Sequence, residues 1–122
     1  MALILVVDDE FSVAEVLQSV LADAGHEVVT AVNGGQGLAL LGKRRPDLVL
    51  LDFMMPIMDG PAMLKAMKED PAYRKVPAVV MSSLPESAVA EAARGMYAAF
   101  LHKPFKLAAI TDIVKTVLSQ QS

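Results

Sequence analysis

The chain reads Leu3-Ile-Leu-Val-Val7 near its start and turns acidic immediately afterwards, at Asp8-Asp9-Glu10. The first five side chains are all apolar, with no polar residue between them. This pattern is typical of a strand that is buried on both faces, as in a parallel sheet covered by helices. Apolar residues at helical spacing follow from Val13 to Leu21, and Gly25 is expected to end that helix. Ser12 or one of the preceding acids is expected to cap it.

The same alternation of strand and helix continues along the chain. Further strands are predicted at Glu27–Ala31, Leu48–Leu51, Val76–Met81 and Ala98–Leu101. Helical faces are predicted around Leu38–Leu41, Met63–Met67, Glu86–Arg94 and Leu107–Leu118. Asn33-Gly34-Gly35 is predicted to be a turn. Five strands alternating with five helices indicate an α/β fold, a doubly wound parallel sheet with helices on both faces.

Length and composition exclude several classes of protein. The 122 residues suit one domain, spanning 1–122. The absence of cysteine excludes disulfide frameworks, thiolate metal sites and thiol catalysis. A formal net charge of -3 with scattered basic residues argues against a nucleic-acid-binding surface. No apolar run approaches the ~18 residues of a membrane span, and the first one is too short for a signal peptide, so the protein is expected to be cytoplasmic.

Polar side chains stand at the ends of four of the predicted strands. They are Asp8 and Asp9, Asp52, Ser82 and Lys103. In an open α/β sheet the ligand site lies outside the carboxyl ends of the strands, so these five side chains are expected to meet there. One such residue alone is as often a helix cap or a solvated loop residue. The complete set at one edge indicates a site.

The residue types in this set suit phosphoryl transfer. Three neighbouring carboxylates repel one another, and a hard divalent cation such as Mg²⁺ relieves that repulsion. Lys103 adds a compact positive charge for a phosphoryl oxygen, and Ser82 can donate a hydrogen bond to the same group. With no cysteine and no suitable histidine, the nucleophile is expected to be an aspartate, which would form an acyl phosphate.

The motifs together resemble the response-regulator receiver domain of two-component signalling, of the chemotaxis-regulator type. The matching pieces are Val6–Glu10, Asp52–Gly60, Val79–Ser83 and Lys103–Phe105, and the resemblance covers residues 2–119. It implies a flavodoxin-like fold with strand order 2-1-3-4-5. It also implies a protein that is not an enzyme in the ordinary sense, but assists its own Mg²⁺-dependent phosphorylation and dephosphorylation.

The resemblance assigns a role to each residue of the acidic site. Asp52 would be the phosphoacceptor. Asp8 and Asp9 would hold Mg²⁺, with Asp52 and the backbone carbonyl of Met54 as further ligands. The phosphoryl donor would be a phosphohistidine of a sensor histidine kinase or of a phosphotransfer protein.

Further roles follow from the same resemblance for the residues that would respond to phosphate. Ser82 would bind the phosphoryl group and report its arrival, and Lys103 would bridge that group and the acidic pair. The Lys103–Pro104 bond would be cis, against ~5–6% of X–Pro bonds in folded proteins. Phe100 occupies the place of the switching aromatic residue, although Tyr97 is an alternative. A partner or a second copy would bind to the face formed by the fourth helix, fifth strand and fifth helix.

Two other functions fit parts of this pattern. One is a receiver-shaped interaction module that no longer uses phosphate. The other is an aspartyl-phosphate hydrolase or phosphotransferase resembling the haloacid dehalogenase family, which needs a second aspartate two residues after the nucleophile. Met54 stands at that place here, so the general acid–base group is missing.

Overall fold

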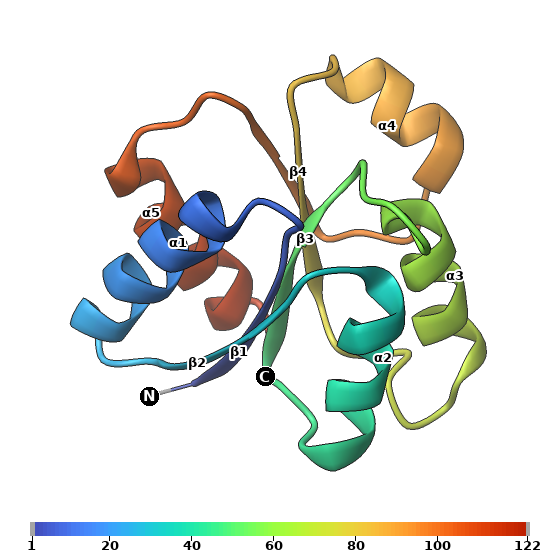
Figure 1. Ribbon diagram of the computed structural model, residues 1–122, viewed down its shortest axis with the longest axis horizontal. Coiled ribbons are helices and arrows are strands. Elements are labelled where there is room, and N and C mark those ends of the chain that lie inside the picture. The colour runs from blue at the N-terminus through green and yellow to red at the C-terminus, as the bar shows by residue number, and fades with distance from the viewer. Residues whose placement is uncertain (1, 122) are drawn as a thin grey trace.

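A computed structural model describes residues 2–121 of the chain as alternating strands and helices (Figure 1). The strands are β1 (Leu3–Val7), β2 (Glu27–Ala31), β3 (Leu48–Asp52), β4 (Ala78–Ser82) and β5 (Ala99–His102). The helices are α1 (Phe11–Asp23), α2 (Gly34–Lys43), α3 (Gly60–Glu69), α4 (Glu86–Ala93) and α5 (Leu107–Ser119). Within the described residues, no helix is both long and apolar enough to span a membrane.

The strands form one parallel sheet in the order β2-β1-β3-β4-β5, which confirms the predicted doubly wound, flavodoxin-like fold. Helices α1 and α5 cover one face of the sheet, and α2, α3 and α4 cover the other (Figure 1). The chain winds in opposite directions from β1 and from β3. In such a sheet the crevice for a ligand lies where the direction reverses, at the carboxyl ends of these two strands.

Two apolar cores, one on each face of the sheet, explain why apolar and polar side chains do not alternate along the central strands. In β3 the side chains of Leu48 and Leu50 pack with α1 and α5, whereas Val49 and Leu51 pack with α2 and α3. Every residue of β3 is buried. Continuous burial of this kind leaves the end of the strand as the place where a polar side chain can reach solvent.

The structure corrects some local expectations. Asn33-Gly34-Gly35 is not a separate turn, because α2 begins at Gly34 and Asn33 is its N-cap, with the Asn33 side chain accepting a hydrogen bond from the Gln36 N–H at 2.9 Å. Ser12 does not cap α1, since it lies inside the helix, and Glu10 at the N-cap position makes no side-chain cap bond. Gly25 follows α1 with a φ of 94°, as predicted for a helix end.

Candidate functional site

The topology brings the predicted polar side chains to one edge of the sheet. Asp52 is the last residue of β3 and Ser82 is the last residue of β4. Asp8 directly follows β1, and Lys103 directly follows β5. Because all of these strands are parallel, their carboxyl ends lie at the same edge. The two strand-end residues are themselves in the sheet, one position beyond the strands predicted from apolar runs.

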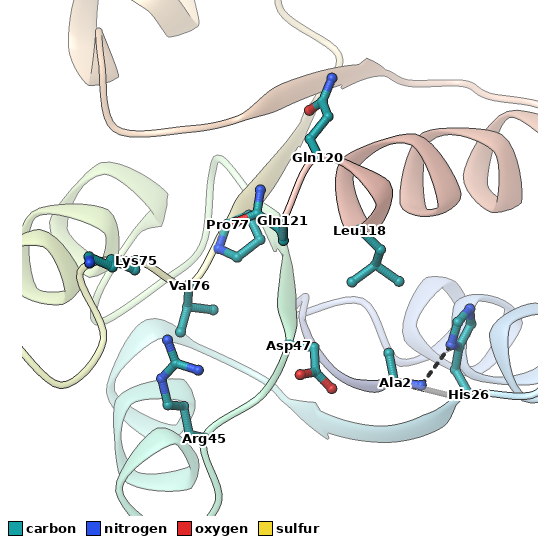
Figure 2. A pocket seen from close by; sticks show the side chains of 10 residues that line it. All are labelled: Ala2, His26, Arg45, Asp47, Lys75, Val76, Pro77, Leu118, Gln120 and Gln121. Carbon is teal, nitrogen blue, oxygen red and sulfur yellow. Dashed lines mark hydrogen bonds between the residues drawn. The ribbon is translucent and has the colours of Figure 1, made fainter.

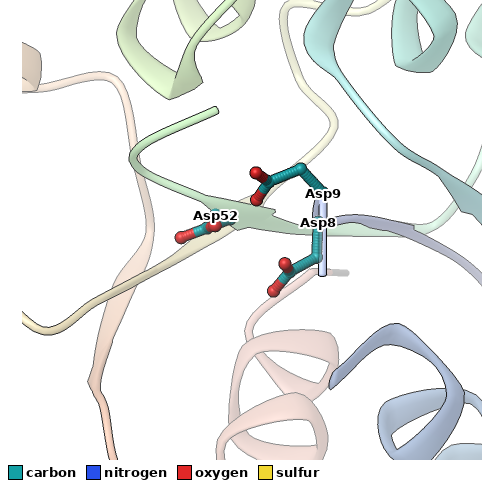
Figure 3. A group of neighbouring side chains, drawn as sticks. All are labelled: Asp8, Asp9 and Asp52. Carbon is teal, nitrogen blue, oxygen red and sulfur yellow. The ribbon is translucent and has the colours of Figure 1, made fainter. Parts of the chain in front are cut away.

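A cavity of about 280 Å³ opens at this edge. Its lining consists of Asp9, Glu10, Asp52, Met54, Ser82, Ser83 and Lys103. Asp8 is fully buried and does not line the cavity. Figure 3 shows the carboxylates of Asp8, Asp9 and Asp52 projecting from the ends of β1 and β3 toward a common region.

The three aspartates form a set that a metal ion could bind. One carboxylate oxygen from each lies within 4.8 Å of the others. Carboxylate oxygens are the ligands that Mg²⁺ takes in proteins, and it usually retains several waters beside them. Only Lys103 among the site residues offsets this negative charge, so the trio keeps a charge excess. The donor atoms present therefore fit a hard divalent cation.

Lys103 lies between several carboxylates. Its Nζ is 3.2 Å from Asp8 Oδ2, 3.4 Å from Asp52 Oδ1 and 3.9 Å from Glu10 Oε1. Asp8 also accepts a hydrogen bond on Oδ1 from the Glu10 N–H at 2.9 Å, so both of its oxygens are engaged. The contact of Glu10 with Lys103 was not predicted. The feature of the sequence that could have indicated this contact is the third consecutive acidic residue, Glu10, directly after Asp8 and Asp9.

The buried position of Asp52 changes its ionisation. Burial, and then the nearby charge of Asp8, raise the pKa of Asp52 from 3.8 to about 6, although Lys103 opposes the change. Burial by itself lowers the pKa of Lys103, but the charges of Asp52 and Asp8 outweigh it and leave that pKa above its usual value. Lys103 is therefore a permanent cation beside a carboxyl group that favours neutralisation.

Ser82 is almost fully buried, and its hydroxyl already has a partner. Its Oγ accepts a hydrogen bond from the Leu84 N–H at 3.0 Å, and its backbone carbonyl accepts one from the Lys103 N–H at 2.8 Å. The Lys103–Pro104 peptide bond is cis, as the resemblance implied.

The two candidate switch aromatics lie in different places. Phe100 lies within β5, paired in register with Val80, and is half-buried against the core on the side of α2, α3 and α4. Tyr97 precedes β5, and its hydroxyl lies 3.4 Å from Glu86 Oε2 at the start of α4. Phe100 thus lies on a strand that ends at the site, while Tyr97 is tied to a helix.

A larger cavity, about 640 Å³, lies at the opposite edge of the sheet (Figure 2). Several of its polar groups are engaged in holding the fold together. His26 accepts from the Ala2 N–H, Asp47 accepts from the Leu3 N–H, and Arg45 donates to the Ala72 carbonyl. In the smaller cavity, at the carboxyl ends of the strands, the charged side chains converge instead, and this cavity is the candidate functional site.

Comparisons with known proteins indicate the family of this chain. The profile of the family described as "Response regulator receiver domain" matches residues 4–115. Sporulation initiation phosphotransferase F of Bacillus subtilis is 36% identical, with 98% of this chain and 95% of that protein covered. Response regulator PleD of Caulobacter vibrioides is 41% identical over 68% of this chain, which spans only 18% of that protein's length.

A solved structure is similar along its whole length. The chemotaxis protein CheY4 of Vibrio cholerae has a TM-score of 0.91 and 30% identity, with 96% of this chain and 98% of that chain covered. The fold, the edge at which the carboxylates meet and the match over residues 4–115 agree with one another. This chain belongs to the receiver domain family of two-component response regulators.

Proposed function

We propose that residues 1–122 act as a single receiver domain in which Asp52 accepts a phosphoryl group from a phosphohistidine. The donor is a sensor histidine kinase or a phosphotransfer protein, the partners with which receiver domains interact. The single observation that carries this proposal is a buried carboxylate at the cavity with Lys103 Nζ 3.4 Å from its Oδ1.

The geometry favours Asp52 over its two acidic neighbours. Asp8 does not line the cavity, and both of its oxygens are engaged. Asp9 is exposed, and Lys103 forms its ion pairs with other carboxylates. Asp52 alone combines access to the cavity, burial and a neighbouring cation.

The proposed step exchanges one phosphoryl linkage for another. An oxygen of Asp52 bonds to phosphorus while the bond to the donor's imidazole nitrogen breaks, and the imidazole keeps that electron pair. Asp8, Asp9, Asp52 and the backbone carbonyl of Met54 would hold Mg²⁺, which neutralises charge on the phosphoryl oxygens when bound. Lys103 stabilises the same charge through its ammonium group.

The remaining site residues respond to the phosphoryl group. The Ser82 hydroxyl turns toward the phosphoryl group and donates a hydrogen bond to one of its oxygens. Phe100, the switch aromatic, moves in response to this displacement of Ser82. Hydrolysis reverses the modification, because water adds to phosphorus and the Asp52 carboxylate leaves. The protein thus assists both reactions while acting as a signalling component.

An apolar groove beside the site supports docking of the donor. It encloses about 580 Å³ between α1 and the connection from β5 to α5, and Lys103 lines both the groove and the site. Val16 and Leu107 on its walls are 45% and 52% exposed. A donor that brings its phosphohistidine to Asp52 must cover this neighbourhood, so an apolar helix face of the donor is the expected occupant.

The decisive experiment uses acetyl phosphate with Mg²⁺ and measures the mass of the intact protein. The wild type should gain one phosphoryl group, and EDTA should prevent the gain. Asp52→Asn should gain none, whereas Asp23→Asn, which changes an exposed carboxylate at the end of α1, should behave as wild type. A full-size adduct on Asp52→Asn would move the phosphoacceptor elsewhere.

A further inference from the structure

The backbone that follows β4 is held at three points. The Ser82 carbonyl accepts from the Lys103 N–H at 2.8 Å, and the Ser82 hydroxyl accepts from the Leu84 N–H at 3.0 Å. The carbonyl of Ser83, between them, lies 3.1 Å from His102 Nε2. The first bond joins main chain to main chain and is available to almost any sequence. The other two depend on particular side chains.

His102 lies between the two parts of the proposed switch, Phe100 on β5 and the segment of Ser82 and Ser83 that follows β4. It is the last residue of β5 and pairs in register with Ser82. Its ring also lies 6.2 Å from the ring of Phe100, centroid to centroid, at an interplanar angle of 57°. One side chain therefore contacts the switch aromatic and, through Ser83, the segment that carries the switch hydroxyl.

The chemistry of the contact sets the state of the imidazole. A carbonyl oxygen can only accept a hydrogen bond, so Nε2 must carry the proton. We assign His102 as an Nε2–H donor, a role that both the neutral Nε2–H tautomer and the imidazolium ion can fill. The contact is thus a directed hydrogen bond from β5 to the connection between β4 and α4.

We propose that His102 is a positioning residue that holds the connection from β4 to α4 in its unphosphorylated arrangement. The inference rests on the proposed function, in which Ser82 binds the phosphoryl group. When Ser82 turns its hydroxyl toward that group, the Leu84 N–H loses its acceptor and the backbone of residues 82–84 must rearrange. The bond from His102 to Ser83 opposes this movement because it ties the middle of the segment to β5.

Loss of the bond should therefore favour the phosphoryl-bound arrangement. A single hydrogen bond at a partly solvated position changes such an equilibrium by a factor of about three to ten. The effect should appear as tighter binding of beryllofluoride, a mimic of the phosphoryl group. His102 is exposed, so its replacement leaves the core intact.

Three variants separate the donor from the ring. His102→Phe keeps an aromatic ring beside Phe100 but removes the donor, His102→Gln keeps an N–H at a similar reach but removes the ring, and His102→Ala removes both. Beryllofluoride affinity in Mg²⁺ is measured by amide NMR titration. Phe and Ala variants should bind about three- to tenfold more tightly than wild type, and the Gln variant should bind as wild type does.

A second measurement does not depend on phosphate chemistry. Hydrogen exchange of the Leu84 amide, without Mg²⁺ or beryllofluoride, should be several-fold faster in the Phe and Ala variants, because the segment is released. Unchanged exchange, unchanged or weaker beryllofluoride binding in the Phe variant, or a Gln variant that matches the Phe variant would each overturn the role of His102. If wild type binds no beryllofluoride, the proposed function fails, and the exchange rates still decide whether His102 holds the segment.

Discussion

In the proposed phosphorylated state, Met54 and Leu84 are the side chains that we expect to flank the phosphoryl group, and both are apolar. Water that hydrolyses an acyl phosphate attacks in line, and a polar side chain near its path can hold it and accept its proton. Neither residue can do so, and we expect slow self-dephosphorylation. Met54→Asn with Leu84→Glu should speed it, and a tenfold change corresponds to ~1.4 kcal/mol of barrier.

The structure indicates that the two substitutions should contribute unequally to the faster dephosphorylation. Met54 lines the site cavity and is 63% exposed, whereas Leu84 is half-buried and lies outside the lining. Met54→Asn alone should therefore give most of the acceleration. The measurement is phosphate release in Mg²⁺ from phosphorylated protein freed of donor. Equal rates in wild type and the double variant would show that these side chains do not control access of water.

The ionisation of Asp52 predicts a pH-dependent stability in the absence of metal. Folding raises its pKa from 3.8 to about 6, so protonated Asp52 favours the folded state at low pH. This contribution is complete below about pH 4 and is lost as the pH rises through about 6. At pH 7 the ionised group should lower the free energy of unfolding by up to about 3 kcal/mol relative to Asp52→Asn.

Urea unfolding in EDTA at a series of pH values would test this expectation. The advantage of Asp52→Asn over wild type should grow from about pH 4 to about pH 7. Adding Mg²⁺ at pH 7 should reduce it, because a bound cation stabilises only a folded state that holds the carboxylate trio. Parallel pH profiles for the two proteins would mean that the buried carboxylate is not penalised.

At the scale of elements, α3 begins against the strand that carries Asp52. A Cβ added at Gly60 would lie 2.9 Å from the Asp52 carbonyl oxygen and 2.9 Å from Phe53 Cα. These are backbone atoms, which cannot relieve the contact by a side-chain rotation. Gly60→Ala should therefore lower the free energy of unfolding by about 1–3 kcal/mol and weaken beryllofluoride binding through displacement of β3.

The matched control is Gly42→Ala in α2, where the nearest atom to the new Cβ outside the helix's own backbone is Tyr73 Oη, at an ordinary contact distance of 3.7 Å. Alanine is the better helix former, so this variant should gain about 0.5–1 kcal/mol. Urea unfolding of both variants measures the contrast. Two changes of the same sign would show that crowding at Gly60 is relieved elsewhere.

Elements built from continuous apolar runs could be predicted from the sequence. β1 has the predicted bounds, because a buried parallel strand shows a signal that few other structures share. β2 also has the predicted bounds, although it is an edge strand on which Glu27 and Thr30 are exposed. The prediction of a turn at the start of α2 was wrong, because Asn-Gly-Gly suits both a turn and a helix N-terminus. The hydrogen bond between Asn33 and Gln36 decides between them, and it depends on backbone conformation rather than on composition.

The candidate site shows the same limit. Asp8, Asp52, Ser82 and Lys103 could be predicted to meet, because parallel topology alone brings strand ends to one edge. The bond of His102 to the Ser83 carbonyl was not predicted, since it depends on how far one side chain reaches across two neighbouring strands. Spacing along the chain encodes the first kind of proximity and not the second.

At the scale of the whole molecule, the site connects the two helical layers. Glu10 at its rim leads directly into α1 on one face of the sheet, and Leu84 leads into α4 on the other. A rearrangement of residues 82–84 therefore acts on α4 first. Of the eight residues of α4, only Val89 and Ala93 are fully buried, so this helix is anchored on a narrow apolar stripe.

The last prediction follows from that anchoring. The face formed by α4, β5 and α5 includes the open edge of the sheet at β5, and Ala92 on α4 is exposed there, although Ala93 packs inward. An exposed edge and a lightly anchored helix form a surface that a second copy can bind, and a phosphoryl group that moves residues 82–84 would reshape it.

We expect beryllofluoride with Mg²⁺ to strengthen a dimer in sedimentation equilibrium. Ala92→Glu should weaken it by placing a charge at the contact, whereas Ala22→Glu, which changes another exposed alanine, on α1, should not. If neither beryllofluoride nor Ala92→Glu changes the mass of the sedimenting species, this face does not carry self-association.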